Sequence, residues 1–522
     1  DQKGGLIKRS FYVGSVQKFI LLLKYAECVI DTIFIRVDSM TRAAEIRAKL
    51  SHPIIDCDGH ILEYQPAFLE YLKKVAGSNV VRRFARALKT GIGPYYFDAD
   101  QTERRRIGAP RGPWWGSPAR NTDDRATAML PALLRSRLDS FGIDFSICYP
   151  TFGLFLVRED DEELRRALCR AINTMHAELF SPHSDRLMPV AMIPVYTPEE
   201  AIEETKFAVQ ELDYRAITIS GFVRRRLPAS LRHGSSATGH VYFYDNIALD
   251  SEYDYDPFWK TCLDLGVVPN VHSSNIGEGS RTSPSTYIYN HIGMFAATCE
   301  AFAKALILGG VTNRFPDLKF AFMEAGVAWA VELCNGMTSH WEKRNGRAID
   351  QFDPQHIDIE RLFNLFQVYG QPALMHSSDG LRESLERIKA TDKGRIEVRD
   401  EFSRTGINSV ADLVDIFARN FYFGCEADDR TIGTAYDPRF IPQGRKFQPI
   451  LGSDIGHWDV PDMTKVIEEA YEQVEKGRLT EDQFRDFVCD APLRLYQGTN
   501  SEFFAGTMVS GYSPRLETAE IA

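Results

Sequence analysis

The sequence predicts a (β/α)₈ barrel. Eight short apolar segments between residues 50 and 455 alternate with longer segments in which apolar residues recur every three or four positions. Such apolar runs are typical of parallel strands buried on both faces, and eight is the number that closes a barrel. A doubly wound open sheet is the competing architecture, but no glycine-rich dinucleotide-binding turn follows the first strand. The barrel is therefore favoured.

The expected strands follow one another at regular intervals. They are residues 53–57, 144–150, 187–194, 215–220, 267–273, 318–325, 420–426 and 448–454. Amphipathic helices are expected at 161–179, 197–212 and 464–477. Asp161 and Thr197 are suitable N-caps for the first two helices, and Gly477 is a suitable C-cap for the third.

Two long insertions interrupt the alternation. Residues 61–140 follow the first strand, and residues 344–419 follow the helix after the sixth strand and look mostly helical. Segments of this length in a compact domain are usually functional covers or contact surfaces. We expect one barrel domain over residues 40–505, with a C-terminal tail at 506–522.

Residues 1–39 form a separate case. Residues 19–35 are apolar, but Lys24, Glu27 and Asp31 interrupt them, so the run is too charged for a membrane span. No small-residue cleavage site follows, as a secretory signal requires. The segment is expected to be a leader or an arm that packs on a neighbour, and no membrane partner is predicted.

Composition limits the partners further. The 522-residue chain has a net charge of −11, whereas a nucleic-acid partner needs a basic face. Its nine cysteines include no CxxC pair, which favours reduced thiols over a disulfide framework. We therefore expect a cytoplasmic protein that binds a small molecule and no nucleic acid.

Reactive side chains occur where the predicted strands end. They are Asp58 and His60 after the first strand, His272 at the fifth, Glu324 at the sixth, and Asp454 and His457 at the eighth. In a barrel these ends meet at one mouth, where catalytic groups lie. Asp58 and His60 are two residues apart, so in an extended chain their side chains point to the same side.

Imidazole and carboxylate groups gathered at one mouth suit a divalent metal with an open position for water. Without a cation, Asp58, Glu324 and Asp454 would repel one another at neutral pH. Asp454 or Glu324 is a candidate to move a proton. The structural alternatives are a core histidine at His272, an N-cap at Asp454, and a structural partner at Glu324.

Four segments together resemble one known family. "IIDCDGHILE", "VHSSN", "ILGGVTNRFPDLKFAFMEAGVAW" and "ILGSDIGHWDVPD" are similar to the amidohydrolase-related family that includes the aminocarboxymuconate semialdehyde decarboxylase-like enzymes. The resemblance spans residues 52 to about 500. It implies one catalytic divalent ion, Zn²⁺ or Mn²⁺, held by Asp58, His60, His272 and Asp454, and a homodimer.

The sequence departs from that family at two positions. Asp58 stands where the family has His or Glu, and Glu324 stands where its decarboxylases have His. Carboxylate ligands favour harder ions, and Glu324 weakens the transfer of a decarboxylase mechanism. Metal-dependent hydrolysis of a small organic acid or ring-containing metabolite is therefore expected first, and non-oxidative decarboxylation second. A barrel that binds without catalysis is the third hypothesis.

Residues that could contact the substrate are less sharply marked. Arg281 follows the fifth strand and could clamp a carboxylate, although a solvated loop charge is the common alternative. His291 is expected at the edge of the site. Trp114 and Trp115, in the first insertion, could cover a hydrophobic substrate or only anchor the insertion. His457 is expected to face the substrate or a ligand rather than to bind the metal.

Overall fold

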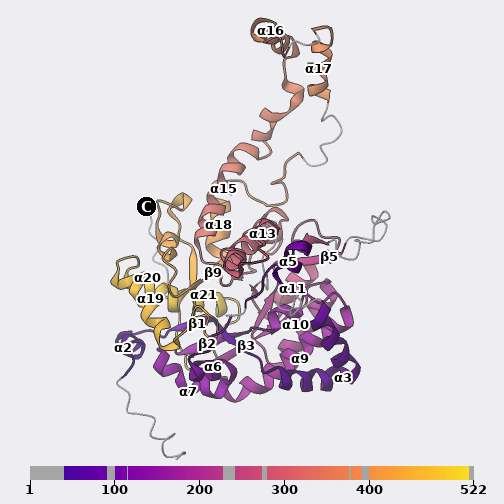
Figure 1. The fold of residues 1–522 in the computed structure, drawn as a ribbon. Coiled ribbons are helices and arrows are strands. Elements are labelled where there is room, and N and C mark those ends of the chain that lie inside the picture. Colours follow the sequence, from indigo (N-terminus) through magenta and orange to yellow (C-terminus); the bar gives the residue numbers. More distant parts are fainter. Residues whose placement is uncertain are drawn as a thin grey trace, which may run out of the picture.

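The computed structural model describes residues 40–90, 100–113, 116–226, 242–272, 279–374, 378–390 and 399–515. Its centre is an eight-stranded sheet in which every pairing between neighbouring strands is parallel (Figure 1). In spatial order the strands are β1 (Ile55–Ile61), β2 (Phe145–Pro150), β3 (Leu187–Met192), β4 (Ala216–Ile219), β7 (Pro269–Val271), β8 (Phe320–Phe322), β9 (Phe421–Glu426) and β10 (Gln448–Gly452). All eight predicted strands are present.

The first and last strands close the sheet on itself. The Asp454 amide donates to the Asp58 carbonyl at 2.8 Å, and the His60 amide donates to the Ile455 carbonyl at 3.1 Å. These bonds continue the ladder from β10 to β1, so the sheet has no free edge there. The predicted barrel is confirmed.

The first strand is longer than the sequence predicted. We expected it to end at residue 57, whereas β1 runs to Ile61 and contains both Asp58 and His60. The polar side chains make this segment look like a loop, but β2 and the segment after β10 satisfy its backbone hydrogen bonds. Its side chains are buried along the whole length, so Asp58 and His60 belong to a rigid strand.

Helices surround the barrel. They are α2 (Arg42–Lys49), α3 (Gln65–Thr90), α5 (Gln101–Ile107), α6 (Thr122–Met129), α7 (Pro131–Phe141), α8 (Gly153–Leu156), α9 (Glu162–Phe180), α10 (Pro198–Leu212), α11 (Asp256–Leu265), α12 (Tyr287–His291), α13 (Met294–Leu308), α14 (Val311–Arg314), α15 (Ala328–Arg344), α16 (Ile359–Tyr369), α17 (Ser378–Ala390), α18 (Val410–Arg419), α19 (Val466–Glu475), α20 (Glu481–Arg485) and α21 (Ala491–Tyr496).

The predicted helix ends are confirmed at three places. The Asp161 side chain accepts from the Leu164 amide and begins α9. Thr197 and Glu200 form a reciprocal capping box at the start of α10. Gly477 adopts φ +66° just beyond α19, the left-handed conformation that ends many helices.

The first insertion folds into helices α3, α5, α6 and α7. Helix α3 packs along α9, and their side chains form a second hydrophobic core that includes Phe68, Leu72 and Phe84. Helix α3 therefore adds a layer outside α9, which itself packs on β3. Trp114 and Trp115 lie outside the described residues.

The second insertion projects from the barrel. Figure 1 shows α16 and α17 at the far end of α15, away from the strands. We call its described residues between α15 and α18 the arm (345–374, 378–390 and 399–409). Helix α16 has no buried residue, and Val368 and Tyr369 are 71% and 77% exposed.

The sequence did not predict a two-stranded antiparallel hairpin outside the barrel, β5 (Val223–Arg226) with β6 (Tyr242–Asp245). Arg225 of this hairpin pairs with Asp245 and donates to the Tyr196 carbonyl, so its role is structural. Within the described residues one stretch, Tyr287–Leu308, is long and apolar enough for a membrane span (mean hydropathy 1.3), and 50% of its most apolar window is buried inside the protein.

Candidate metal centre

Five of the predicted donors meet at the C-terminal end of the barrel. Asp58 and His60 lie on β1, His272 follows β7 directly, Glu324 lies two residues after β8, and Asp454 lies two residues after β10. Their side chains are at most 4% exposed. The barrel thus brings together residues almost 400 positions apart, as expected for strand ends that share one mouth.

The donor atoms converge on the Nε2 atoms of the two strand histidines. His60 Nε2 lies 3.3 Å from His272 Nε2, 3.5 Å from Asp58 Oδ1 and 3.3 Å from Asp454 Oδ1. His272 Nε2 lies 3.7 Å from Asp58 Oδ1 and 3.4 Å from Glu324 Oε2. Two overlapping sets of donor atoms each fit within 4.8 Å and share His60: one with Asp58 and His272, the other with Glu324, Asp454 and His457.

The carboxylates of this cluster lack the partners that buried charges need. Asp58 Oδ1 and Asp454 Oδ2 are buried without a hydrogen bond, and Asp454 Oδ1 faces the ring nitrogens of His60 and His457. Within the described parts of the chain, histidines are the only ion-pair partners of Asp58, Glu324 and Asp454. Buried anionic groups are stable when they are paired or coordinate a metal. The donor set therefore fits a divalent cation.

Burial also sets the protonation of the donors. It lowers the pKa of His60 and of His272 to about 3, so both rings are neutral at neutral pH and keep the lone pair that a metal ligand needs. Burial raises the pKa of Asp58 to about 6. Burial and then the neighbouring carboxylates raise the pKa values of Glu324 and Asp454 well above the usual range. A bound cation would reverse that effect.

Two of the carboxylates stand on strained backbone. Glu324 has φ +53° and Asp454 has φ +48°, which places both in the left-handed region that residues other than glycine rarely adopt. Such strain persists where the surrounding structure enforces it, and it is common at functional sites. Here it turns both side chains into the barrel mouth immediately after their strands end.

Asp56 supports the site and was not singled out from the sequence. Its carboxylate is fully buried and accepts hydrogen bonds from the Ser146 hydroxyl at 2.6 Å, the Ser453 hydroxyl at 2.8 Å and amide at 2.9 Å, and the Asp58 amide at 3.1 Å. It therefore joins β2 and the residue after β10 to the part of β1 that carries Asp58. Only the paired carboxylates in "DCD" signalled it.

His457 lies beside the centre rather than outside it. Its Nδ1 lies 2.6 Å from Asp454 Oδ1, and its ring packs on that of His60 at 3.9 Å between centroids. Two further carboxylates, Glu426 and Asp459, lie near enough to raise the pKa of Asp454, and sequence reasoning missed both. Glu426 is the last residue of β9, and Asp459 lies in the loop after β10. These positions near strand ends were the signal that the sequence offered.

A run of aromatic rings leads from the buried donors to the surface. Phe295 lies 5.6 Å from the ring of His272 and 5.6 Å from that of His291, which in turn lies 5.6 Å from Trp458. Trp458 is 41% exposed. His291 Nε2 also lies 3.8 Å from Glu324 Oε1, so the predicted position of His291 at the edge of the site is where the structure places it.

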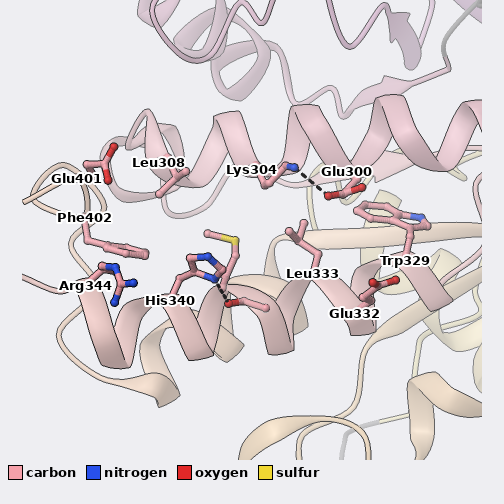
Figure 2. A pocket seen from close by; sticks show the side chains of 12 residues that line it. Glu300, Lys304, Leu308, Trp329, Glu332, Leu333, His340, Arg344, Glu401 and Phe402 are labelled. Carbon is pink, nitrogen blue, oxygen red and sulfur yellow. Dashed lines mark hydrogen bonds and ion pairs between the residues drawn. The ribbon is translucent and has the colours of Figure 1, made fainter. Parts of the chain in front are cut away.

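Other predicted contacts are less direct. Arg281 is exposed and lies beside Gly293, with no described contact to the metal-donor cluster. A well-formed cavity of about 480 Å³ lies elsewhere, between α13 and α15, and is lined by Trp329, His340 and Phe402 among others (Figure 2). It includes none of the donors, so the site is assigned from donor chemistry and not from cavity size.

A closed barrel with buried histidine and carboxylate donors at the C-terminal ends of its strands defines a class, the metal-dependent barrel enzymes. Within that class the chain belongs to the amidohydrolase family, whose sequence profile matches residues 55–498.

Individual relatives are more distant. Over 159 residues the chain is 26% identical to the 2-amino-3-carboxymuconate-6-semialdehyde decarboxylase of Dictyostelium discoideum, a match that covers 30% of this chain and 38% of that protein. An amidohydrolase of Mycobacterium avium subsp. paratuberculosis is 16% identical, with a TM-score of 0.49 over 86% of this chain and 98% of that one. The 5-carboxyvanillate decarboxylase of Novosphingobium aromaticivorans, solved with manganese, is 13% identical, with a TM-score of 0.48 over 86% and 97%.

Proposed function

We propose that this chain is a metal-dependent decarboxylase of a small, planar, unsaturated carboxylic acid. The observation that carries the proposal is the buried donor cluster with unpartnered carboxylate oxygens, reached along a run of aromatic rings. The donors suit a cation that receives a carboxylate, and the rings suit a flat, conjugated body.

The ligands proposed for the ion are Asp58, His60, His272 and Asp454, and the ion is Zn²⁺ or Mn²⁺. When bound, a divalent ion would hold the substrate carboxylate and a neighbouring oxygen and stabilise negative charge as the bond to carbon breaks. The rigid strand β1 fixes two of these ligands and the bonds between β1 and β10 fix a third. The site is thus preorganised by the barrel and needs little rearrangement.

Glu324 is the proposed proton donor. As the carbon–carboxylate bond breaks, CO₂ leaves, the electron pair stays on carbon, and a proton from Glu324 completes the new C–H bond. His291 Nε2 lies 3.8 Å from Glu324 Oε1, and the His291 side chain is 16% exposed. His291 can therefore pass a proton from solvent back to Glu324. Phe295 and Trp458 would flank the substrate and exclude water.

Two observations support decarboxylation over the hydrolysis that the sequence alone put first. The curated relative is named as a decarboxylase, and the aromatic rings favour a flat acid. Hydrolysis is the second candidate, because the same ion and the same Glu324 or Asp454 could activate water. The two reactions differ in their products, so one assay separates them.

The experiment loads the purified protein with Mn²⁺ or Zn²⁺ and offers a panel of hydroxybenzoic and conjugated dienoic acids in D₂O. A decarboxylase releases CO₂ and places one deuterium on the carbon that lost it. Glu324→Gln should retain the ion and lose about 10²-fold or more in turnover. Cleavage or ring opening with ¹⁸O uptake from water, and no CO₂, would replace the proposal with hydrolysis.

A second copy of the chain is the proposed partner of the arm. Val368 and Tyr369 at the end of α16 and Leu374 in the turn after it are 71%, 77% and 63% exposed, so large apolar side chains gather on this part of the arm. A size-exclusion column calibrated for mass should show a species of twice the chain mass. The double variant Val368→Glu, Tyr369→Glu should elute at the mass of one chain. A wild-type protein that elutes as one chain would contradict the homodimer.

A further inference from the structure

The turn after β2 contacts the candidate metal centre through one hydroxyl. Thr151 Oγ1 lies 3.1 Å from His457 Nε2 with hydrogen-bond geometry. The other ring nitrogen, Nδ1, faces Asp454 Oδ1 at 2.6 Å. The ring of His457 is therefore held at both nitrogens, one toward the donor cluster and one toward Thr151.

The same turn is bound tightly to the end of β1. Two carboxylate oxygens of Glu63 accept hydrogen bonds from the Phe152 amide at 2.8 Å and the Gly153 amide at 3.1 Å. The Thr151 amide donates to the Ile61 carbonyl at 3.1 Å. Glu63 is 1% exposed, so these bonds form out of contact with water, where they are worth more than at the surface.

We propose that Glu63 and Thr151 are positioning residues of the metal centre, which together fix the His457 imidazole with Nδ1 toward Asp454. The inference rests on the proposed function only for what His457 then does in the reaction. Glu63 anchors the turn to β1, and the anchored turn presents the Thr151 hydroxyl to Nε2. Thr151 reaches the donor cluster only through His457, and Glu63 reaches it only through the turn that carries Thr151.

The chemistry of imidazole gives this arrangement its consequence. An Nδ1–Oδ1 distance of 2.6 Å suits a proton on Nδ1 that is donated to the Asp454 carboxylate, and the Thr151 hydroxyl then donates to the lone pair of Nε2. His457 thereby orients the carboxylate of Asp454, one of the proposed ligands. Partners of this kind orient the groups that bind a metal, and their loss typically lowers metal affinity 10- to 100-fold.

A purely structural role for the same residues makes a different prediction. If Glu63 only caps the four-residue helix α8 and Thr151 only satisfies its own hydroxyl, their substitution lowers stability and leaves the ring and the ion unchanged. The readouts must therefore report on His457 and on the ion, and not on folding alone.

The experiment uses the full chain with Co²⁺ as the probe, followed by its visible absorption, together with the ring ¹⁵N shifts of His457 in the metal-free protein. Thr151→Val removes the hydroxyl at constant size and should weaken Co²⁺ binding about 10-fold, alter the absorption spectrum and shift the tautomer of His457. Thr151→Ser keeps the hydroxyl and should restore both. Glu63→Gln offers the amides of the turn one acceptor oxygen instead of two. It should therefore produce smaller changes of the same kind in Co²⁺ affinity and in the tautomer of His457.

The control is Thr405→Val in the arm, which removes a buried threonine hydroxyl that donates to the Phe402 carbonyl and contacts no metal donor. It should leave both spectra as in the wild type. If Thr151→Val does not fold, Thr151→Ala is measured in its place. Unchanged ¹⁵N shifts in the Thr151 variants would overturn the inference.

The outcome is separable from that of the proposed function. A protein with no decarboxylase activity but with the Co²⁺ and ¹⁵N changes supports the positioning role and refutes only the reaction. A wild type that binds no Co²⁺ refutes the metal centre, and the ¹⁵N shifts of the metal-free protein still decide whether Thr151 orients His457.

Discussion

His60 Nε2 lies 3.3 Å from His272 Nε2, although 212 residues separate them in the chain. Burial lowers the pKa of each ring to about 3, so both are neutral at neutral pH. Each neutral ring carries one proton, so the two Nε2 atoms share either a hydrogen bond or a cation. The buried carboxylates of Asp58 and Asp454 beside the pair favour the cation.

Metal binding should require the rings of His60 and His272 and the neighbouring carboxylate of Asp58. We expect about one Zn or Mn per chain in protein purified without chelators, and loss of the ion in His272→Ala and Asp58→Ala. Elemental analysis measures this. His340→Ala is the control and should retain the ion, because His340 lines the cavity between α13 and α15, which includes none of the donors. A metal-free wild type would favour the non-catalytic barrel.

Asp56→Ala should destabilise the barrel by about 3 kcal/mol, because it leaves four buried donors without an acceptor. Urea unfolding followed by tryptophan fluorescence measures the change. Ser146→Ala, which removes one of the four bonds, should cost about 1 kcal/mol. Equal stabilities of Asp56→Ala and wild type would show that the closure of the barrel does not depend on this carboxylate.

Gly452→Ala should weaken metal binding without altering any ligand. A Cβ at Gly452 would lie 2.9 Å from the Cβ of Asp58, and neither atom can rotate away. Asp58 must therefore shift, at a cost of about 1–3 kcal/mol in stability. Titration with Mn²⁺ followed by electron paramagnetic resonance measures the affinity. Gly336→Ala on α15, where a Cβ meets nothing within 4 Å, is the control and should gain about 0.5–1 kcal/mol. Full affinity in Gly452→Ala would show that Asp58 is not a ligand.

Acid should destabilise the protein partly through His176. Burial lowers its pKa from 6.5 to about 3, so between these values the unfolded chain binds a proton that the folded chain does not. The free energy of unfolding then falls with falling pH by about 1.4 kcal/mol per unit well below pH 6.5. His176→Gln should remove that contribution, while His60 and His272 retain theirs. Urea unfolding at pH 7, 6 and 5 compares the slopes, and equal slopes would contradict the buried neutral ring.

Much of the barrel could be predicted because its signals are local. Apolar runs in the strands and capping residues such as Asp161 and Thr197 act within a few positions, and the structure has them where expected. The β5–β6 hairpin was not predicted because its residues include Arg225 and Asp245, whose charges are compensated by each other and by groups elsewhere in the chain. The predicted first strand ended too early for the same reason, because the partners that bury Asp58 and His60 lie far along the chain.

The candidate site likewise has one part that could be predicted from the sequence and another that could not. The sequence by itself determined which residue types end the strands, and strand ends share one mouth in any parallel barrel, so Asp58, His60, His272, Glu324 and Asp454 could be grouped in advance. Only the tertiary structure decided that Asp56 joins β1 to the residue after β10, that Thr151 holds His457, and that exposed Arg281 lies beside Gly293. Those relationships depend on side-chain directions and distances of a few ångströms between distant segments, which periodicity and spacing along one chain do not encode.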